Sequence, residues 1–304
     1  MKIVYFGNGS RGQVCLEALV DAGHNVSLVV CLPKEEQPSW TTPMQVVAMG
    51  LGIPVWDGKV ECVAPTIEEM NPDIIILAGY PKMVSADIYE IPKLCINLHA
   101  GPLPRYRGPH PLNWQLINGE TRGGISIIKV DGGVDTGPIL AKKQFKIPLH
   151  WDYTDMVKIA NEHYPLMLLY VLDGFEKGTM KRIEQNPEEG FWCSRRYPRD
   201  GLINWSEMTD VQVYNMVRAL VSPMPGAYTT IQNESVFIKE SVVTLETVKL
   251  LARTYTGIPG RVAATWPSGV VVLCKNRGIL IETVIRDGEK VPPKDVFPPT
   301  GGDL

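Results

Sequence analysis

Asn97 and His99 are the residues whose types and spacing point most directly to chemistry. They lie in Cys95-Ile96-Asn97-Leu98-His99, an apolar stretch that predicts a buried strand. Side chains two positions apart share one face of a strand, so the amide and the imidazole should lie side by side. Imidazole exchanges its proton near neutral pH, which suits it to acid-base work. The alternative is a strand end whose Asn and His are hydrogen-bonded and have no further role.

The strand must end directly after His99. Gly101-Pro102-Leu103-Pro104-Arg105-Tyr106-Arg107-Gly108 contains two prolines that cannot continue a central ladder. The carboxyl end of a strand in an open α/β sheet is where ligands bind, so this segment is a candidate wall of a site. His110 is a competing catalytic histidine, although its position before Pro111 also suits a helix start or a pocket wall.

A second candidate is the turn Asp131-Gly132-Gly133-Val134-Asp135-Thr136-Gly137-Pro138. Three glycines in one short turn that also carries two carboxylates suggest a backbone that approaches another group closely. Asp and Gly also dominate ordinary turns, so either Asp taken alone is more simply a turn residue.

Alternating strands and helices must position these residues. The first half of the chain predicts a doubly wound, mostly parallel sheet, Rossmann-like in architecture. The strands are expected at 2–6, 26–31, 53–56, 73–78, 95–99, 125–130 and from 139, with helices at 13–22, 43–49, 66–70 and 110–117.

The first turn, Gly7-Asn8-Gly9-Ser10-Arg11-Gly12, matches the glycine pattern of dinucleotide sites. In such sites the second strand ends in an acid that binds the ribose. Here it ends in Cys31-Leu32-Pro33, and Glu35 and Glu36 follow only inside a loop. The glycines therefore indicate a tight turn and a close helix approach more strongly than an NAD site.

The second half of the chain predicts a smaller domain. A helix over 152–176 is followed by polar and proline-containing segments at 185–190 and 194–198, which read as a connection. A helix over 210–220 and short alternating segments at 236–238, 242–244, 269–273 and 279–284 suggest a small, OB-like β-barrel. We predict a catalytic domain over 1–190, a linker over 191–205 and a C-terminal domain over 206–304.

Composition is that of a soluble globular protein. The chain has 304 residues, 44% hydrophobic, with a formal net charge of −3. Its six cysteines form no Cys-x-x-Cys pair and no His cluster adjoins them, so neither a disulfide framework nor a zinc site is indicated. No signal peptide or membrane-spanning run is evident. We expect a cytoplasmic protein.

These motifs, taken together, resemble the 10-formyltetrahydrofolate-dependent formyltransferase family. Asn97-Leu98-His99 resembles its Asn-x-His, 103–108 its Leu-Pro-x-Tyr-Arg-Gly loop, and Asp135-Thr136-Gly137 its Asp-Thr-Gly. The segment 200–205 and Pro225-Gly226-Ala227 are similar to the linker and C-terminal domain of its two-domain members. Glycinamide ribonucleotide formyltransferase is similar across the first domain only.

The resemblance implies roles for particular residues. Asn97, His99 and Asp135 would be the catalytic set, and N10-formyltetrahydrofolate the co-substrate, with neither NAD nor a metal. An amine would attack the formyl carbon; Asn97 and a charged His99 would stabilise the oxyanion, and Asp135 would orient the imidazole. The folate would lie between two loops, whose residues are Tyr80, Lys82, Met83 and Val84, and Asp131, Gly132, Gly133 and Val134.

The acceptor amine is predicted from charge. Nucleic-acid affinity rests on Lys and Arg, yet the loop after the second strand carries Glu35 and Glu36, and residues 200–304 hold 10 basic and 11 acidic residues. We therefore expect a UDP- or dTDP-linked amino sugar of the 4-amino-4,6-dideoxy type, used for bacterial surface glycans. A homodimer is also considered. The residues expected on the acceptor side are Asn8, Ser10, Arg11, Arg105, Tyr106, Arg107 and His110.

Other activities stay open. Methionyl-tRNA formyltransferases are similar over both domains, and a formyltetrahydrofolate hydrolase-like enzyme is compatible with 123–127 and 187–190. A non-enzymatic binding module would require that His99 and Asp135 be replaceable without loss of turnover.

Overall fold

The computed structural model describes residues 1–37, 39–231, 234–242 and 255–304. It divides into two compact units. The first comprises Met1–Pro111, Arg122–Lys146 and Val157–Ser194, and the second comprises Leu112–Thr121, Ile147–Met156 and Arg195–Leu304. Two short segments that precede residue 190 thus group with the later part of the chain. The domain boundaries at 190 and 205 stay a prediction.

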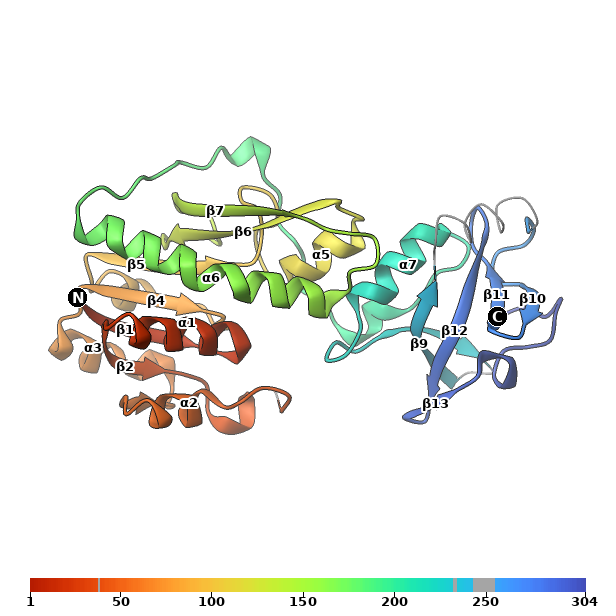
Figure 1. Cartoon of the computed structure of the whole chain (residues 1–304), viewed down its shortest axis with the longest axis horizontal. Helices are drawn as coiled ribbons and strands as arrows, with labels where there is room; N and C mark the ends of the chain where they lie inside the picture. Colours follow the sequence, from red (N-terminus) through yellow and green to blue (C-terminus); the bar gives the residue numbers. More distant parts are fainter. Residues whose placement is uncertain (38, 232–233, 243–254) are drawn as a thin grey trace. The chain divides into compact units, whose positions relative to one another are not determined.

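A seven-stranded sheet forms the centre of the first unit, in the order β3-β2-β1-β4-β5-β6-β7 (Figure 1). Neighbours from β3 to β5 pair in parallel, whereas β6 and β7 are antiparallel. The predicted mostly parallel, Rossmann-like sheet is confirmed. Its strands are β1 (Lys2–Gly7), β2 (Asn25–Val30), β3 (Val55–Trp56), β4 (Ile74–Ala78), β5 (Leu94–His99), β6 (Arg122–Lys129) and β7 (Ile139–Lys146).

Helices cover both faces of this sheet. Val4 and Phe6 of β1 pack in one buried cluster with Ile67 of α3 and Ile88 of α4. Tyr5 points to the opposite face, where its hydroxyl donates to the Gly12 carbonyl of α1 at 2.7 Å. Burial on both faces explains why the central strands are continuous apolar runs. The helices of the first unit are α1 (Gly9–Asp21), α2 (Met44–Gly50), α3 (Ala64–Met70), α4 (Ala86–Tyr89) and all but the first turn of α6 (Tyr153–Glu176), whereas α5 (Pro111–Ile117) groups almost wholly with the second unit.

Helix α1 begins at Gly9, earlier than the predicted start at 13. Gly9 has φ +61, a conformation that glycine adopts without strain. At Gly12 a Cβ atom would lie 3.1 Å from the Ala78 carbonyl oxygen of β4. The glycine run is therefore a tight turn with close helix-to-strand packing.

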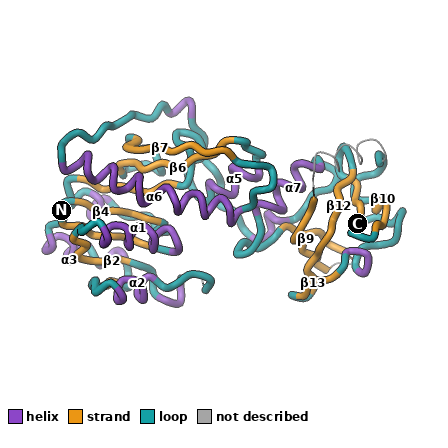
Figure 2. The backbone as a smooth tube through the Cα atoms, viewed as in Figure 1, coloured by secondary structure: helices purple, strands orange, loops and turns teal. Residues whose placement is uncertain are grey.

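The second unit contains α7 (Asp210–Ala219) and a separate antiparallel sheet in the order β10-β11-β12-β9-β8, with β13 paired to β12 (Figure 2). The predicted smaller β-rich domain is confirmed at the level of this sheet. Of the expected segment 242–244, residues 243–244 lie outside the described residues. The strands are β8 (Ala227–Ile231), β9 (Glu234–Val242), β10 (Val262–Trp266), β11 (Gly269–Leu273), β12 (Gly278–Arg286) and β13 (Glu289–Val291).

Thr209 caps α7, and its removal should destabilise the chain. The Thr209 hydroxyl accepts from the Gln212 backbone N–H at 3.2 Å, and the Gln212 side chain accepts from the Thr209 N–H at 2.9 Å. We expect Thr209→Ala to lower the free energy of unfolding by about 1 kcal/mol, because helix N–H groups lose their acceptor. Urea denaturation followed by circular dichroism measures this. The control Ser206→Ala, whose hydroxyl lies outside the helix, should change it by less than about 0.5 kcal/mol.

Among the described residues, no helix combines the length and the apolar composition that crossing a bilayer requires.

Candidate functional site

Asn97, His99 and Asp135 meet at the carboxyl end of β5. Asn97 Nδ2 donates to Asp135 Oδ1 at 3.2 Å, and His99 Nδ1 lies 3.3 Å from Asp135 Oδ2. Asn97 and His99 lie on one face of β5, while the intervening Leu98 is buried on the other. Asp135 comes from the connection between β6 and β7. The fold thus brings together the three residues that the resemblance singled out, although 36 positions or more separate the carboxylate from the other two.

His99 is almost completely buried and faces an acceptor at each ring nitrogen. Its Nε2 lies 2.7 Å from the Tyr106 carbonyl oxygen, and its Nδ1 faces the Asp135 carboxylate. Burial lowers the pKa of His99, and Arg11 adds to this effect, whereas Asp135 and the Tyr106 carbonyl act in the opposite direction. A charged ring satisfies both contacts, and burial favours release of its proton. This arrangement can chemically hold a proton on the imidazole and release it.

A third contact fixes the Asp135 carboxylate. Its Oδ2 accepts from the Gly108 backbone N–H at 2.8 Å. Asp135 has φ +55 and Tyr106 has φ +62, so both loops adopt a left-handed conformation at the site. Such backbone strain persists only where the surroundings determine it. The loop 103–108 and the 131–137 turn are thus fitted to each other around His99.

Gln185 and Trp192, which the sequence analysis did not single out, lie against this turn. Gln185 Nε2 donates to the carbonyl oxygens of Asp135 and Gly137, at 2.9 and 2.7 Å. Trp192 Nε1 donates to the Val134 carbonyl at 3.2 Å. Gln185 comes from the polar segment 185–190 and Trp192 from the predicted linker 191–205, and no sequence pattern marked either of them.

Arg105, Tyr106, Arg107 and His110 fall into two environments. Arg107 is 1% exposed, with Nε and Nη2 donating to Gln185 Oε1. Tyr106 is also buried, and its ring packs edge-on against Phe191 at 4.7 Å between centroids. Arg105 and His110 are exposed at the surface. Within this loop the Arg107 side chain therefore points into the protein, whereas the Arg105 side chain lies at the surface.

The first-turn residues lie close to the same site. Arg11 Nη1 donates to the Leu98 carbonyl at 3.0 Å, and its guanidinium carbon lies 5.0 Å from the centre of the Tyr164 ring. Ser10 accepts from Asn161 at 3.0 Å. Two buried polar atoms here, Asn8 Oδ1 and Arg11 Nε, have no hydrogen-bond partner among the residues that the structure describes. Arg11 thus lies close to His99, because it donates to the backbone of Leu98, the residue before His99.

The loop residues 80–84 are more varied than expected. Tyr80 packs edge-on against Phe6 at 5.3 Å, and burial raises its pKa to about 12. Lys82 forms a surface ion pair with Glu36 at 2.8 Å. Val84 is buried in the sheet core, whereas Met83 is 74% exposed. Of these side chains, Met83 is the most exposed, while Tyr80 is half-buried.

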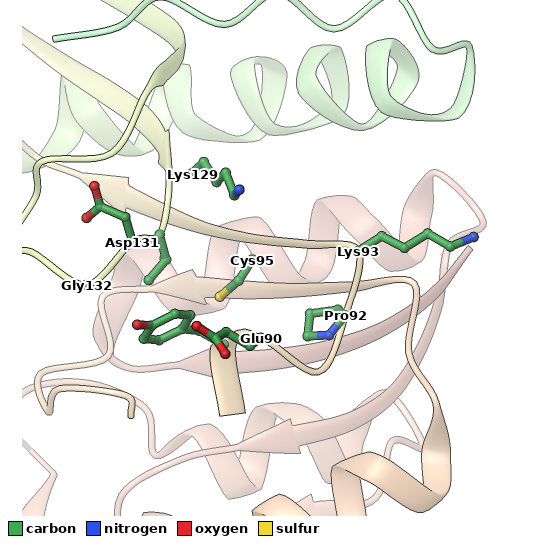
Figure 3. A pocket seen from close by; sticks show the side chains of 9 residues that line it. Glu90, Pro92, Lys93, Cys95, Lys129, Asp131 and Gly132 are labelled. Atoms are coloured by element: carbon green, nitrogen blue, oxygen red, sulfur yellow. The ribbon is translucent and has the colours of Figure 1, made fainter. Parts of the chain in front are cut away.

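A cavity of about 360 Å³ adjoins the other predicted loop (Figure 3). Asp131 and Gly132 line it together with Cys95 of β5. Lys93 stretches away from the other lining side chains in Figure 3. The volume is in the range of small-molecule sites. Its remaining lining residues are Tyr89, Glu90, Pro92, Lys129 and Val130.

In the part of the chain that the structure describes, no cluster of three or more His, Cys, Asp or Glu residues has the geometry to hold a metal ion.

Two solved structures share the fold. The chain is similar to the N-formyltransferase from Helicobacter canadensis, solved with folinic acid and dTDP-3-aminofucose, with a TM-score of 0.71 and 17% identity over 93% of this chain and 99% of that one. It is also similar to HypX from Aquifex aeolicus in complex with tetrahydrofolic acid, with a TM-score of 0.67 and 19% identity. That match covers 97% of this chain but only 46% of HypX. At these identities the likeness concerns the fold, and both proteins bind folate derivatives.

Curated relatives correct the predicted acceptor. The chain is 33% identical to a methionyl-tRNA formyltransferase from Geobacter metallireducens, over 95% of this chain and 92% of that protein. It is 30% identical to one from Citrifermentans bemidjiense, over 98% and 92%. The expectation of a sugar nucleotide is therefore wrong. Net charge misled it, because salt screens charges beyond about 8 Å, so that partner choice depends on local clusters.

Two family models match in sequence order and cover most of the chain. The formyl transferase model matches residues 1–171, which contain β1 to β7 and the meeting point of Asn97, His99 and Asp135. The model for the formyl transferase C-terminal domain matches residues 196–297, which contain α7 and the antiparallel sheet. With relatives at 33% identity along nearly the full length, the chain belongs to the formyl transferase family.

Proposed function

We propose that this chain transfers a formyl group from N10-formyltetrahydrofolate to the α-amine of methionyl-tRNA. The observation that carries the proposal is the match to curated methionyl-tRNA formyltransferases over 92% of their length. A protein that shared only the N-terminal formyl transferase domain would align with the first part of this chain and not with its C-terminal part.

The co-substrate would supply an activated formyl group. The catalytic residues would be Asn97, His99 and Asp135. Asn97 uses one amide hydrogen on Asp135, and its second is left to donate to the oxygen on which negative charge develops. The charged form of His99 stabilises the same oxygen. The neutral form takes the proton that the attacking amine loses. Asp135 holds the ring in the orientation that both roles require.

The folate would bind beside the 131–135 turn. The cavity of about 360 Å³ reaches from Cys95 to Gly132, and its polar lining, with two carboxylates and two ammonium groups, could hydrogen-bond the edge of a pterin ring. The half-buried Tyr80 and the exposed Met83 would form the opposite wall. Backbone groups of Gly132 and Gly133 are accessible there, since neither residue has a side chain to cover them.

Local charge supports an RNA acceptor better than net charge does. Arg195, Arg196 and Arg199 fall within five positions, and Arg199 has an 82% exposed side chain. Arg196 lies over the Trp114 ring at 5.2 Å. Arginines beside aromatic rings bind phosphates and stack on bases.

Formylation of purified methionyl-tRNA tests the proposal. The chain is incubated with N10-formyltetrahydrofolate, and the aminoacyl group is analysed by mass after deacylation. We expect formylmethionine to accumulate, with a rate that falls steeply as salt rises, because phosphate contacts release counterions. Alanine in place of Arg195 and Arg199 together should raise KM and reduce the salt dependence. Lys181→Ala/Arg182→Ala, at exposed positions outside that segment, is the matched control.

Two outcomes would contradict the proposal. Folate consumption without formylmethionine would indicate hydrolysis of the co-substrate. Equal turnover on free methionine and on methionyl-tRNA would mean that the RNA is not part of the recognised substrate.

Gly101 should be essential for the His99 position. A Cβ atom on Gly101 would lie 2.7 Å from His99 Nε2 and 2.7 Å from the Tyr106 carbonyl oxygen. We expect Gly101→Ala to displace the ring and lower kcat about tenfold, since small misplacements of catalytic groups are costly. Steady-state formylation measures the effect. Gly50→Ala, where an added Cβ would meet no described atom within 4 Å apart from the backbone of its own helix, is the control. Unchanged kcat in Gly101→Ala would show that the ring tolerates displacement.

A further inference from the structure

We propose that Gln185 and Trp192 are positioning residues, which hold the Asp135 turn in the geometry that the His99 contact requires. The inference rests on the proposed function, because it assigns these residues to the same reacting centre. Neither residue touches Asn97, His99 or the Asp135 carboxylate in any recorded contact. They act on the backbone of the turn that carries the carboxylate.

The Gln185 amide bridges two carbonyl groups on either side of Thr136. Its Nε2 donates to Asp135 O at 2.9 Å and to Gly137 O at 2.7 Å, which uses both amide hydrogens. These carbonyls belong to the turn between β6 and β7, where the sheet ladder does not yet hold the backbone. One side chain thus fixes the peptide groups directly after Asp135.

Arg107 determines which way the Gln185 amide points. Its Nε and Nη2 donate to Gln185 Oε1 at 3.1 and 2.8 Å. A guanidinium can only donate, so the amide oxygen must face Arg107 and the amide nitrogen must face the turn. Arg107 is 1% exposed, and a buried charge is costly unless its hydrogen bonds are made. The two residues therefore fix each other.

Trp192 contacts the same turn at Val134, the residue before Asp135. Its Nε1 donates to Val134 O at 3.2 Å, and its ring lies 4.8 Å from the Arg107 guanidinium carbon. The backbone around it is anchored as well, because Arg107 N donates to Phe191 O at 3.0 Å and Cys193 N donates to Arg107 O at 2.7 Å. The segment 185–193 thus forms a strap across the loop and the turn.

This strap accounts for the strained backbone at Asp135. A non-glycine residue at φ +55 needs surroundings that determine it. Carbonyl contacts at 134, 135 and 137, with the Gly108 N–H on the carboxylate, supply them. If the strap loosens, the carboxylate moves away from His99 Nδ1, and the charged form of the ring loses its partner.

Gln185→Glu separates positioning from simple packing. Glutamate keeps acceptors for Arg107 and nearly the same shape, but it has no N–H for the two carbonyls and repels them. We expect kcat for methionyl-tRNA formylation to fall about 10²-fold with KM changed less than about threefold. Gln144→Glu, at an exposed position of β7, is the matched control. A kcat at the wild-type value in folded Gln185→Glu would overturn the role of Gln185.

Trp192→Phe supplies a readout that needs no turnover. Phenylalanine retains an aromatic ring beside Arg107 but has no N–H to donate to Val134 O, and at a position that is 54% exposed the smaller ring leaves no buried cavity. The imidazole NMR signal of His99 is identified as the one that is lost in His99→Ala. Its titration with pH gives the pKa of His99 in the full chain. Because Asp135 raises that pKa, a loosened turn should lower it, together with a ~3- to 10-fold loss in kcat.

The outcomes distinguish this inference from the proposed function. A His99 pKa in Trp192→Phe equal to that of wild type and of the control Trp40→Phe would overturn the role of Trp192. If the wild-type chain does not formylate methionyl-tRNA, the proposed acceptor is wrong. The NMR titration of His99 would still test whether Trp192 positions Asp135.

Discussion

Replacing His99 with alanine is expected to lower kcat for formyl transfer about 10²- to 10⁴-fold, the usual contribution of a positioned acid-base group. The expectation follows from the two contacts of the ring. Its Nδ1 lies 3.3 Å from the Asp135 carboxylate, and its Nε2 lies 2.7 Å from the Tyr106 carbonyl oxygen. Alanine removes both contacts together with the imidazole that holds the proton between them.

Single-turnover formylation with saturating co-substrate measures the chemical step in His99→Ala. Folding is checked by thermal denaturation, because removal of a buried ring leaves a cavity that itself costs stability. His150→Ala, at an exposed histidine, should retain the wild-type rate. Turnover within threefold of wild type in a folded His99→Ala chain would exclude His99 as the acid-base group and leave the exposed His110 to be tested.

Asp135→Asn is expected to lower kcat by up to about 10⁴-fold, as the same change does for the carboxylate behind a serine-protease imidazole. The new amide can still accept from the Gly108 N–H through the oxygen that also faces His99 Nδ1, but its NH2 group then faces Asn97 Nδ2, which is itself a donor. His99 must donate to a carboxylate at Nδ1, and an amide cannot hold its charged form equally well.

The pH dependence should move in a defined direction. The Asp135 carboxylate raises the pKa of His99, so its neutralisation lowers that pKa further below the usual value. If neutral His99 accepts the amine proton, activity is lost as pH falls through this pKa. The acid limb of kcat/KM in Asp135→Asn should therefore lie at lower pH than in wild type. An acid limb at the same pH would mean that a group other than His99 controls it.

Asp173→Asn is the control for this comparison, since Asp173 is exposed and pairs only with Lys177 in the recorded contacts. Its pH profile should overlay that of wild type. A shift in both variants would point to a general charge effect rather than to the contact between Asp135 and His99.

The amino-acid sequence determined the local part of this site. Period-two alternation placed Asn97 and His99 on one face of a buried strand, and the prolines at 102 and 104 ended that strand. Motif order identified the family and singled out Asp135 in advance. The strand and its end are set within a few residues, whereas Asp135 was assigned through the resemblance, since alone it reads as a turn residue.

Only the tertiary structure decided which side chains contact the 103–108 loop and the Asp135 turn. Arg105 and Arg107 are two positions apart in one motif, yet the first is exposed and the second is buried on Gln185. Gln185 and Trp192 carry no motif, because their role depends on a chain segment that returns 50 residues later to the Asp135 turn. Which side chain meets which carbonyl is fixed by long-range packing, and neither periodicity nor charge encodes it locally. Net charge misjudged the acceptor for a related reason, since recognition depends on where charges gather on the folded surface.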